Sequence, residues 1–291
     1  MSLVITGASG ELGHRTAELL LDTPGIDPAN VVLISRSPDK LGDLATRGAQ
    51  VRFGDFDETS SLPAAFRGAT RALIISTLEL GTRVTGHLAA LDAAKAAGAE
   101  LVAYTSIPNP DPQRNPSLVV PDHAKTEEAF ARSGVAYAFL RNSLYSEYRI
   151  PEAQGAQASG KYTFNTGDGA SAYVSREDCA AAAAAVLAGG DEHANMTYDI
   201  TGPDLLDGPA LARTYAAVTG ATVAPVAVDD TTFVAFLVGI GLPEPVAQLL
   251  ASMGQAIREG QLNQRSGHVE QLTGRTPRSV HAVLEAAGLG G

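Results

Sequence analysis

Continuous apolar runs alternate with segments of helical period over the first half of the chain. The apolar runs occupy residues 3–5, 31–35, 51–53, 72–76, 101–105 and 137–140. Residues 81–98 and 122–134 carry apolar side chains at helical spacing and end on glycine, with Asp122 as the expected N-cap of the second helix. Because strands of a parallel sheet are buried on both faces, this pattern predicts a parallel sheet covered by helices on both sides.

The alternation weakens after residue 150, where shorter elements follow. We expect a short strand and an Ala-rich helix within 162–190, a strand in 197–203, a helix over 208–220 and a strand over 223–228. Two helices are expected within 229–260, the second beginning at Pro243. The Pro-rich stretch 109–122 is either a mobile flap or a long connection.

These elements predict an α/β fold, with a Rossmann-type doubly wound parallel sheet and a smaller mixed α/β C-terminal lobe. Residues 1–150 are expected to form an NADP-binding domain, to which 173–200 returns. Residues 151–172 and 201–291 are expected to form the substrate-binding lobe.

Composition excludes several classes of protein. The net charge of -11 argues against nucleic acid, which requires clustered basic residues. The chain has no apolar stretch of membrane-spanning length and no signal-peptide pattern at its start. Its one cysteine, Cys179, is expected to be a packing residue, and no Cys/His cluster suggests a metal. We therefore expect a cytoplasmic protein without nucleic acid, membrane or metal partners.

Three glycines, Gly7, Gly10 and Gly13, stand between the first apolar run and the first helix. At such a turn a dinucleotide pyrophosphate binds against the helix N-terminus, and a Cβ atom would hold it away. A glycine-rich loop that binds nothing is the alternative, but the position between strand and helix favours a nucleotide. The expected contacts with the cofactor are Thr6, Gly7, Ser9, Gly10, Glu11, Leu12 and Gly13.

The end of the second predicted strand indicates which dinucleotide binds. An acidic residue there would bind the ribose of NAD, but this strand ends on Ser35 and Arg36, with Lys40 following. A guanidinium matches a 2′-phosphate, so NADP (NADPH) is the expected cofactor. Alternatively, Arg36 and Lys40 form a solvated surface group with Asp39.

Polar residues follow the next strands as well. Asp55 is placed to accept from the adenine amino group and Phe56 to cover the ring, although Asp55 also suits a turn. Because ligands of open parallel sheets bind at the carboxyl edge, hydroxyl side chains there are expected to line the ribose and nicotinamide. These hydroxyls belong to Ser76, Thr77, Thr105 and Ser106.

A proton donor is harder to find. None of the eight tyrosines has a lysine four residues later, so the Tyr-x-x-x-Lys dyad of many dehydrogenases is missing. His123 and Glu127 stand at i, i+4 on a predicted helix and either orient a proton donor or form a surface pair. The chain also has no G-x-S-x-G and no Walker motif, which argues against serine-hydrolase and nucleotide-hydrolase chemistry.

Taken in order, "TGASGELG", "GDFDE", "AYTSI", "DHAKTEEAFARSGVAYAFLRNSLYSEY" and "YVSREDCAAAAAAVL" resemble the NmrA-like atypical short-chain dehydrogenases/reductases. The resemblance is strongest to their quinone oxidoreductase type 2 and triphenylmethane reductase branch. Its middle motif, H-x-x-T-E followed by LRN-x-x-Y, falls on His123, Thr126, Glu127, Leu140, Arg141, Asn142 and Tyr145. The resemblance implies NADPH along the sheet edge and a planar acceptor beside Asn142 and Tyr145. His123 is the third candidate catalytic residue, and the role of Lys125 is left open.

These observations favour an NADPH-dependent reductase that transfers hydride to a quinone or similar conjugated acceptor. Such an acceptor delocalises the negative charge, so a strong buried acid is less necessary. An NADP(H)-binding redox sensor without turnover and a pathway-specific biosynthetic reductase remain alternatives. Apolar residues of the last two helices are expected to wall the acceptor site or to pack the lobe: Phe233, Phe236, Leu237, Leu242 and Leu249. The sequence does not determine the oligomeric state, and a homodimer is one possibility.

Overall fold

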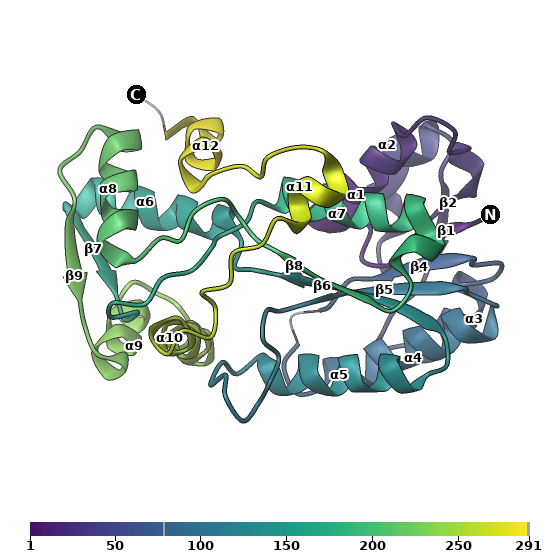
Figure 1. The fold of residues 1–291 in the computed structure, drawn as a ribbon, viewed down its shortest axis with the longest axis horizontal. Coiled ribbons are helices and arrows are strands. Elements are labelled where there is room, and N and C mark those ends of the chain that lie inside the picture. The colour runs from purple at the N-terminus through teal and green to yellow at the C-terminus, as the bar shows by residue number, and fades with distance from the viewer. Residues whose placement is uncertain (78, 290–291) are drawn as a thin grey trace.

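A seven-stranded sheet runs through the larger part of the molecule, in the order β3-β2-β1-β4-β5-β6-β8 (Figure 1). The computed structural model describes residues 1–77 and 79–289. All neighbouring strands of this sheet pair in parallel. Its strands are β1 (Leu3–Ile5), β2 (Val31–Ser35), β3 (Gln50–Phe53), β4 (Arg71–Ile74), β5 (Leu101–Ser106), β6 (Ala136–Asn142) and β8 (Met196–Ile200).

Helices cover both faces of the sheet, as the apolar strands require. One face carries α1 (Glu11–Leu21), α2 (Gly42–Thr46), α7 (Arg176–Gly189) and α11 (His268–Thr273). The other face carries α3 (Leu62–Ala65), α4 (Arg83–Ala96) and α5 (Val120–Arg132). Short 3-10 turns lie at Pro28–Asn30, Pro38–Leu41, Thr59–Ser61, Ser146–Tyr148 and Gly190–His193.

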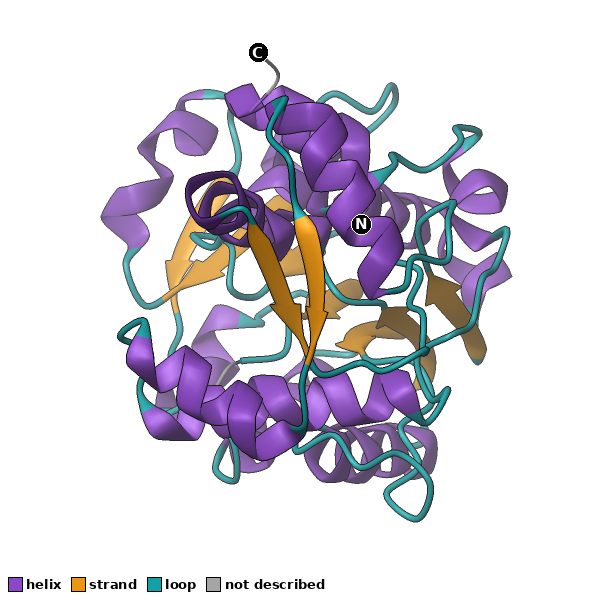
Figure 2. Ribbon diagram, turned by 90° about the vertical axis from the view of Figure 1, so that its left-hand side faces the viewer, coloured by secondary structure: helices purple, strands orange, loops and turns teal. Residues whose placement is uncertain are grey.

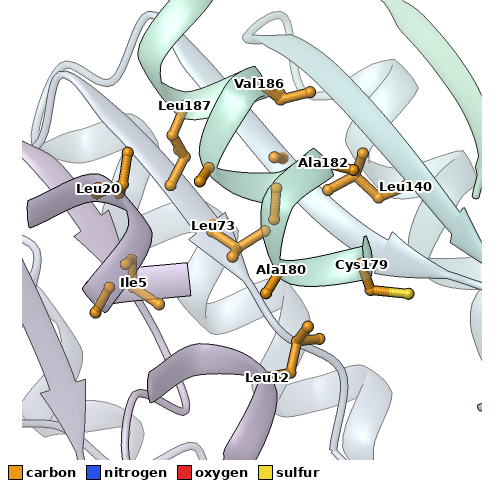
Figure 3. Close-up of a cluster of buried hydrophobic side chains, with 14 of the residues drawn as sticks. Ile5, Leu12, Leu20, Leu73, Leu140, Cys179, Ala180, Ala182, Val186 and Leu187 are labelled. Carbon is orange, nitrogen blue, oxygen red and sulfur yellow. The ribbon is translucent and has the colours of Figure 1, made fainter. Parts of the chain in front are cut away.

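The core on the first face lies between the sheet, α1 and α7 (Figure 3). Ile5, Leu73 and Leu140 project from the strands toward Leu20 of α1 and the alanines of α7. Small side chains let α7 pack closely, and each buried aliphatic side chain in such a core contributes about 1.5–3 kcal/mol. Cys179 is a free, buried thiol in this cluster, which confirms its predicted packing role.

A smaller lobe contains a second, two-stranded parallel sheet, β7 (Lys161–Phe164) beside β9 (Ala224–Ala227). Figure 2 looks at the molecule from this side, with the two strands in front of their helices. The lobe helices are α6 (Arg149–Ser159), α8 (Gly208–Thr219), α9 (Asp230–Gly239), α10 (Glu244–Arg258) and α12 (Val280–Leu284). Stacked and edge-on rings of Tyr162, Phe164 and Tyr215 fill its core. The predicted class, a doubly wound parallel sheet with a smaller mixed lobe, is confirmed.

The path of the chain between the two parts explains the weaker alternation after residue 150. After β6 the chain forms α6 and β7 in the lobe, and then α7 and β8 rejoin the sheet, β8 pairing with β6. One segment of the predicted 201–291 lobe lies elsewhere: α11 packs against α7 on the sheet. Residues 290–291 of that range lie outside the described residues, and the division into domains stays a prediction.

Three local predictions need correction. Asp122 is not an N-cap: α5 begins at Val120, and the Asp122 carboxylate lies inside the first turn, where it binds Arg83. Pro243 precedes the second lobe helix as its cap, and α10 begins at Glu244. The strand expected at 72–76 ends at Ile74, because Ser76 turns out of the ladder toward Thr105.

The Pro-rich loop after β5 is anchored to α10. The Leu118 N–H donates to Ser252 Oγ at 3.1 Å, and Asn109 bonds Gln261. Ile107, Val119 and Ile257 share one small apolar cluster. These contacts favour the long connection over the mobile flap.

Among residues 1–77 and 79–289, none of the helices has the length and apolarity that crossing a bilayer requires.

Candidate functional site

The glycine turn joins β1 to α1 at the carboxyl edge of the sheet, where the strand order reverses between β1 and β4. Gly7 has a φ of +61°, which favours glycine. A Cβ on Gly13 would lie 2.5 Å from the Gly7 carbonyl oxygen. Gly13 therefore lets α1 start directly against the backbone of the turn.

The N-terminus of α1 has the features of an anion-binding site. Gly10 is its N-cap and provides no side-chain acceptor for the first N–H groups. Glu11 and Leu12 follow as the first helical residues. The free N–H groups and the helix dipole together favour a phosphate, so the turn fits the diphosphate of a dinucleotide.

Hydroxyl groups fix the turn to its neighbouring strands. Ser35 Oγ donates to Ser9 Oγ at 2.8 Å, and Ser37 N–H donates to Ser35 Oγ at 2.9 Å. The buried Thr6 hydroxyl donates to the Leu73 carbonyl at 3.2 Å. Ser9 and Thr6 thus hold the turn between β2 and β4, whatever they contact in a ligand.

Arg36 extends from the end of β2 with 61% of its side chain exposed, and its ion-pair partner is Asp57 at 3.8 Å. Lys40 is exposed on the following 3-10 turn. An exposed pair of this length is worth little, so Arg36 can exchange Asp57 for a ligand phosphate. The alternative was that Arg36 and Lys40 form a solvated surface group with Asp39. The pairing of Arg36 with Asp57 does not support it.

Asp55 and Phe56 lie at the end of β3, and both have structural partners. An Asp55 carboxylate oxygen accepts the Asp57 N–H at 3.0 Å, which is the turn role that the alternative assigned to it. Phe56 packs edge-on to His87, with ring centroids 6.0 Å apart. Adenine binding by these two residues stays a prediction.

The hydroxyl side chains of Ser76, after β4, and Thr105, at the end of β5, lie side by side at the carboxyl edge of the sheet. Ser76 N–H donates to Thr105 Oγ1 at 2.8 Å, and the two side-chain oxygens lie 3.2 Å apart. Thr77 N–H donates to His87 Nε2 at 3.2 Å. Ser106 is buried and its Oγ has no partner.

Asn142 and Tyr145 lie together at the end of β6. Asn142 Nδ2 donates to the Tyr145 hydroxyl at 3.4 Å, while Asn142 Oδ1 is buried without a partner. A buried unpaired amide oxygen costs about 1–3 kcal/mol, which marks this position as one that fits a polar ligand group. Burial raises the pKa of Tyr145, so the phenol is neutral at pH 7.

His123 and Glu127 occupy adjacent turns of α5, but the structure does not support either interpretation of them as a pair. Both are buried, which excludes a surface pair. Glu127 holds the Arg141 guanidinium through two bonds, at 3.0 and 2.7 Å. His123 Nδ1 lies 2.9 Å from the Tyr104 hydroxyl.

The family-like motif therefore braces α5 against the sheet. Glu127 reaches β6 through Arg141, and His123 reaches β5 through Tyr104. The Thr126 hydroxyl donates to the Asp122 carbonyl at 2.8 Å within α5 itself. Burial lowers the pKa of His123 well below its usual value. His123 is thus a neutral hydrogen-bonding group at pH 7, and a role in proton transfer stays a prediction.

Two arginines near these residues were not predicted from the sequence. Arg83 is buried on α4 and donates to Asp122 at 3.0 Å and to the Thr77 carbonyl at 2.9 Å. Arg176, the first residue of α7, pairs with Glu11 at 2.7 Å. Arg176 stands within the motif "YVSREDCA", but only the fold shows that it reaches α1.

Fold and site together define a dinucleotide-binding α/β protein, with a glycine turn at the switch point and polar groups along the carboxyl edge. Residues 7–189 match the family described as NAD(P)H-binding. The chain belongs to this NAD(P)H-binding, NmrA-like family of reductases.

Relatives cover nearly the whole chain. Quinone oxidoreductase 2 of Escherichia coli is 34% identical, over 94% of this chain and 93% of its own. A crystal structure of an NADPH-dependent quinone oxidoreductase from Escherichia coli, complexed with NADPH, has a TM-score of 0.93 at 32% identity and covers 98% and 99% of the two chains. That of Citrobacter sp. triphenylmethane reductase, complexed with NADP(H), has a TM-score of 0.91 at 30% identity and covers 98% and 100%. The expected family resemblance is confirmed.

Proposed function

We propose that the protein is an NADPH-dependent reductase of quinones or similarly conjugated planar acceptors. The observation that carries the proposal is the Asn142–Tyr145 pair at the end of β6, a neutral phenol held by an amide. The relatives named above support the same class of reaction. When bound, NADPH supplies the hydride.

The glycine turn and Arg36 are proposed to bind the two phosphate groups of the cofactor, which are the central diphosphate and the 2′-phosphate of the adenosine ribose. The turn offers free N–H groups to the diphosphate, and Arg36 offers its exposed guanidinium to the 2′-phosphate. Ser76, Thr77, Thr105 and Ser106 form the edge along which the rest of the dinucleotide lies.

Asn142 is proposed to bind a polar group of the cofactor or acceptor through its unpaired oxygen. Tyr145 is proposed to donate a hydrogen bond to the acceptor. A conjugated acceptor spreads the added charge, so orientation and desolvation at this edge supply much of the catalysis. A simple carbonyl would need a stronger proton donor than a neutral phenol whose partner is an amide.

The direct test is turnover. Purified protein is mixed with NADPH and a panel of benzoquinones, naphthoquinones, azo dyes and triphenylmethane dyes, and loss of the NADPH absorbance is followed. We expect turnover with at least one conjugated acceptor and none with simple aliphatic ketones. NADPH binding without turnover of any acceptor would overturn the proposal in favour of a sensor, and turnover confined to carbonyl substrates would favour a biosynthetic reductase.

Replacing Arg36 by alanine is expected to weaken NADPH binding about tenfold and to leave NADH binding within about twofold, because only NADPH carries the 2′-phosphate. The measurement is a fluorescence titration with each dinucleotide. Arg47→Ala is the matched control, since Arg47 is also an exposed arginine paired with an aspartate, Asp22. Equal losses for both dinucleotides would contradict the assignment.

Replacing Tyr145 by phenylalanine is expected to lower kcat at least about tenfold while the Kd for NADPH stays within about twofold, since the hydroxyl is lost and the ring is kept. Steady-state kinetics with the best quinone measure this. Tyr148→Phe is the control, because the rings of Tyr145 and Tyr148 both contact the Arg176 guanidinium, but Tyr148 is exposed. An unchanged kcat would show that Tyr145 only packs.

A further inference from the structure

Arg176 reaches the first turn of α1 from a helix far away in the sequence. Its Nη1 lies 2.7 Å from Glu11 Oε2, at the first helical residue after the glycine turn. The arginine side chain is 21% exposed, whereas that of Glu11 is 76% exposed. The cation is therefore largely buried, whereas the carboxylate is exposed to solvent at the first helical residue of α1.

Two tyrosine rings hold the guanidinium in place. Its central carbon lies 5.0 Å from the ring centroids of both Tyr145 and Tyr148. The backbone N–H of Arg176 donates to the Glu147 carboxylate at 2.9 Å, which ties the start of α7 to the same segment. Stacking of a planar cation on aromatic rings in this way is characteristic of arginine.

The stability of α7 does not explain this placement. A cation at the first residue of a helix is opposed by the helix dipole. The connection between α1 and α7 is already made one turn further along by Arg15, which bonds Glu177 at 2.6 and 3.0 Å. The position of Arg176 is therefore explained by its contact with Glu11 beside the glycine turn.

Glu11 poses an electrostatic problem for the proposed ligand. Its carboxylate suits the N-terminus of α1 as long as the turn is empty. A diphosphate bound to the same N–H groups would place two further negative charges near it, and like charges repel one another. An uncompensated Glu11 would weaken dinucleotide binding.

We propose that Arg176 is a positioning residue that neutralises Glu11 and so allows the glycine turn to accept the cofactor diphosphate. The inference rests on the proposed function, because it requires a dinucleotide at this turn. It assigns to the Tyr145–Tyr148 segment a second task, which is to hold Arg176 over Glu11.

The test is a set of titrations with NADPH, followed by fluorescence, on Arg176→Gln, Glu11→Gln and the double variant. Arg176→Gln should raise the Kd about tenfold, because Glu11 is left uncompensated. The double variant should return to within about twofold of the original Kd, because the repelling carboxylate is gone. The loss in Arg176→Gln should shrink at high salt, which screens exposed charges.

Two further variants separate charge from packing. Arg176→Lys keeps the cation and should keep the Kd within about threefold of the original value. Arg15→Gln removes the neighbouring pair between the same two helices and should lower the melting temperature without changing the Kd. Circular dichroism confirms that each variant is folded.

The outcomes distinguish this inference from the proposed function. Failure of the unsubstituted protein to bind NADPH would overturn both. Normal binding by Arg176→Gln, or a double variant that binds as weakly as Arg176→Gln, would overturn the inference alone and assign Arg176 to packing.

Discussion

Replacing Gly13 by alanine is expected to abolish measurable NADPH binding and to lower the free energy of unfolding by about 2–4 kcal/mol. The added Cβ would lie 2.5 Å from the Gly7 carbonyl oxygen and 2.9 Å from the Ala8 Cα. Both are backbone atoms, so the clash is relieved only if α1 moves away from the turn. That movement displaces the N–H groups that the diphosphate requires. Urea unfolding and an NADPH titration measure the two effects.

Gly42→Ala is the matched control. Gly42 begins α2 with a φ of -60°, and a Cβ there meets nothing within 4 Å. Alanine at this position should leave NADPH binding unchanged and stability unchanged or slightly increased. A Gly13→Ala protein that binds NADPH normally would show that the contact between α1 and the turn is not needed for binding.

Replacing Arg83 by methionine is expected to cost about 3–5 kcal/mol of unfolding free energy, because it leaves Asp122 buried without its cation. The two side chains are 3% and 11% exposed and lie 3.0 Å apart. Arg83 also bonds the carbonyls of Thr77 and Val119, so one side chain connects α4, the Thr77 edge and the start of α5. We therefore expect a raised KM for NADPH as well, measured by steady-state kinetics beside urea unfolding.

Arg132→Met provides the comparison for Arg83. Arg132 forms a pair with Glu128 at 3.0 Å, but the two side chains are 79% and 59% exposed. Removing this pair should change stability by less than about 0.5 kcal/mol. Similar losses in the two variants would show that burial does not determine the contribution of Arg83. Replacing Asp122 by leucine in the Arg83→Met background should recover part of the loss, because the unpaired carboxylate is then removed.

The buried braces explain how a site can be specific without many charged groups. Glu127–Arg141 and Arg83–Asp122 fix α5 against β6 and α4, on the sheet face opposite α1 and α7. The polar edge itself contains mostly hydroxyls and one amide, from Ser76, Thr105 and Asn142. A rigid edge of this kind suits the proposed reaction, whose main requirement is that two planar rings be held in a fixed orientation.

The first half of the chain agrees best with the elements that its sequence predicts. Its strands were predictable because both faces of a parallel sheet are buried, so the runs at 3–5 and 31–35 are continuous and apolar. The glycine turn was predictable because only glycine meets its local demands, such as the positive φ of Gly7. The return of residues 173–200 toward the sheet was expected, whereas the docking of α11 on α7 was not.

The sequence by itself therefore determined the fold class, the glycine turn and the positions of the polar strand ends, since each depends on a local pattern. Only the tertiary structure decided which polar groups meet: Glu127 with Arg141 and not with His123, Asp122 with Arg83, and Arg176 with Glu11. Charged side chains at helical spacing bind each other only if the fold brings no other partner of opposite charge within reach. Once α5 and α7 are packed on the sheet, a buried charge must be paired, and its partner is the group that the fold brings within hydrogen-bond distance. Spacing along the chain then no longer determines which side chains pair.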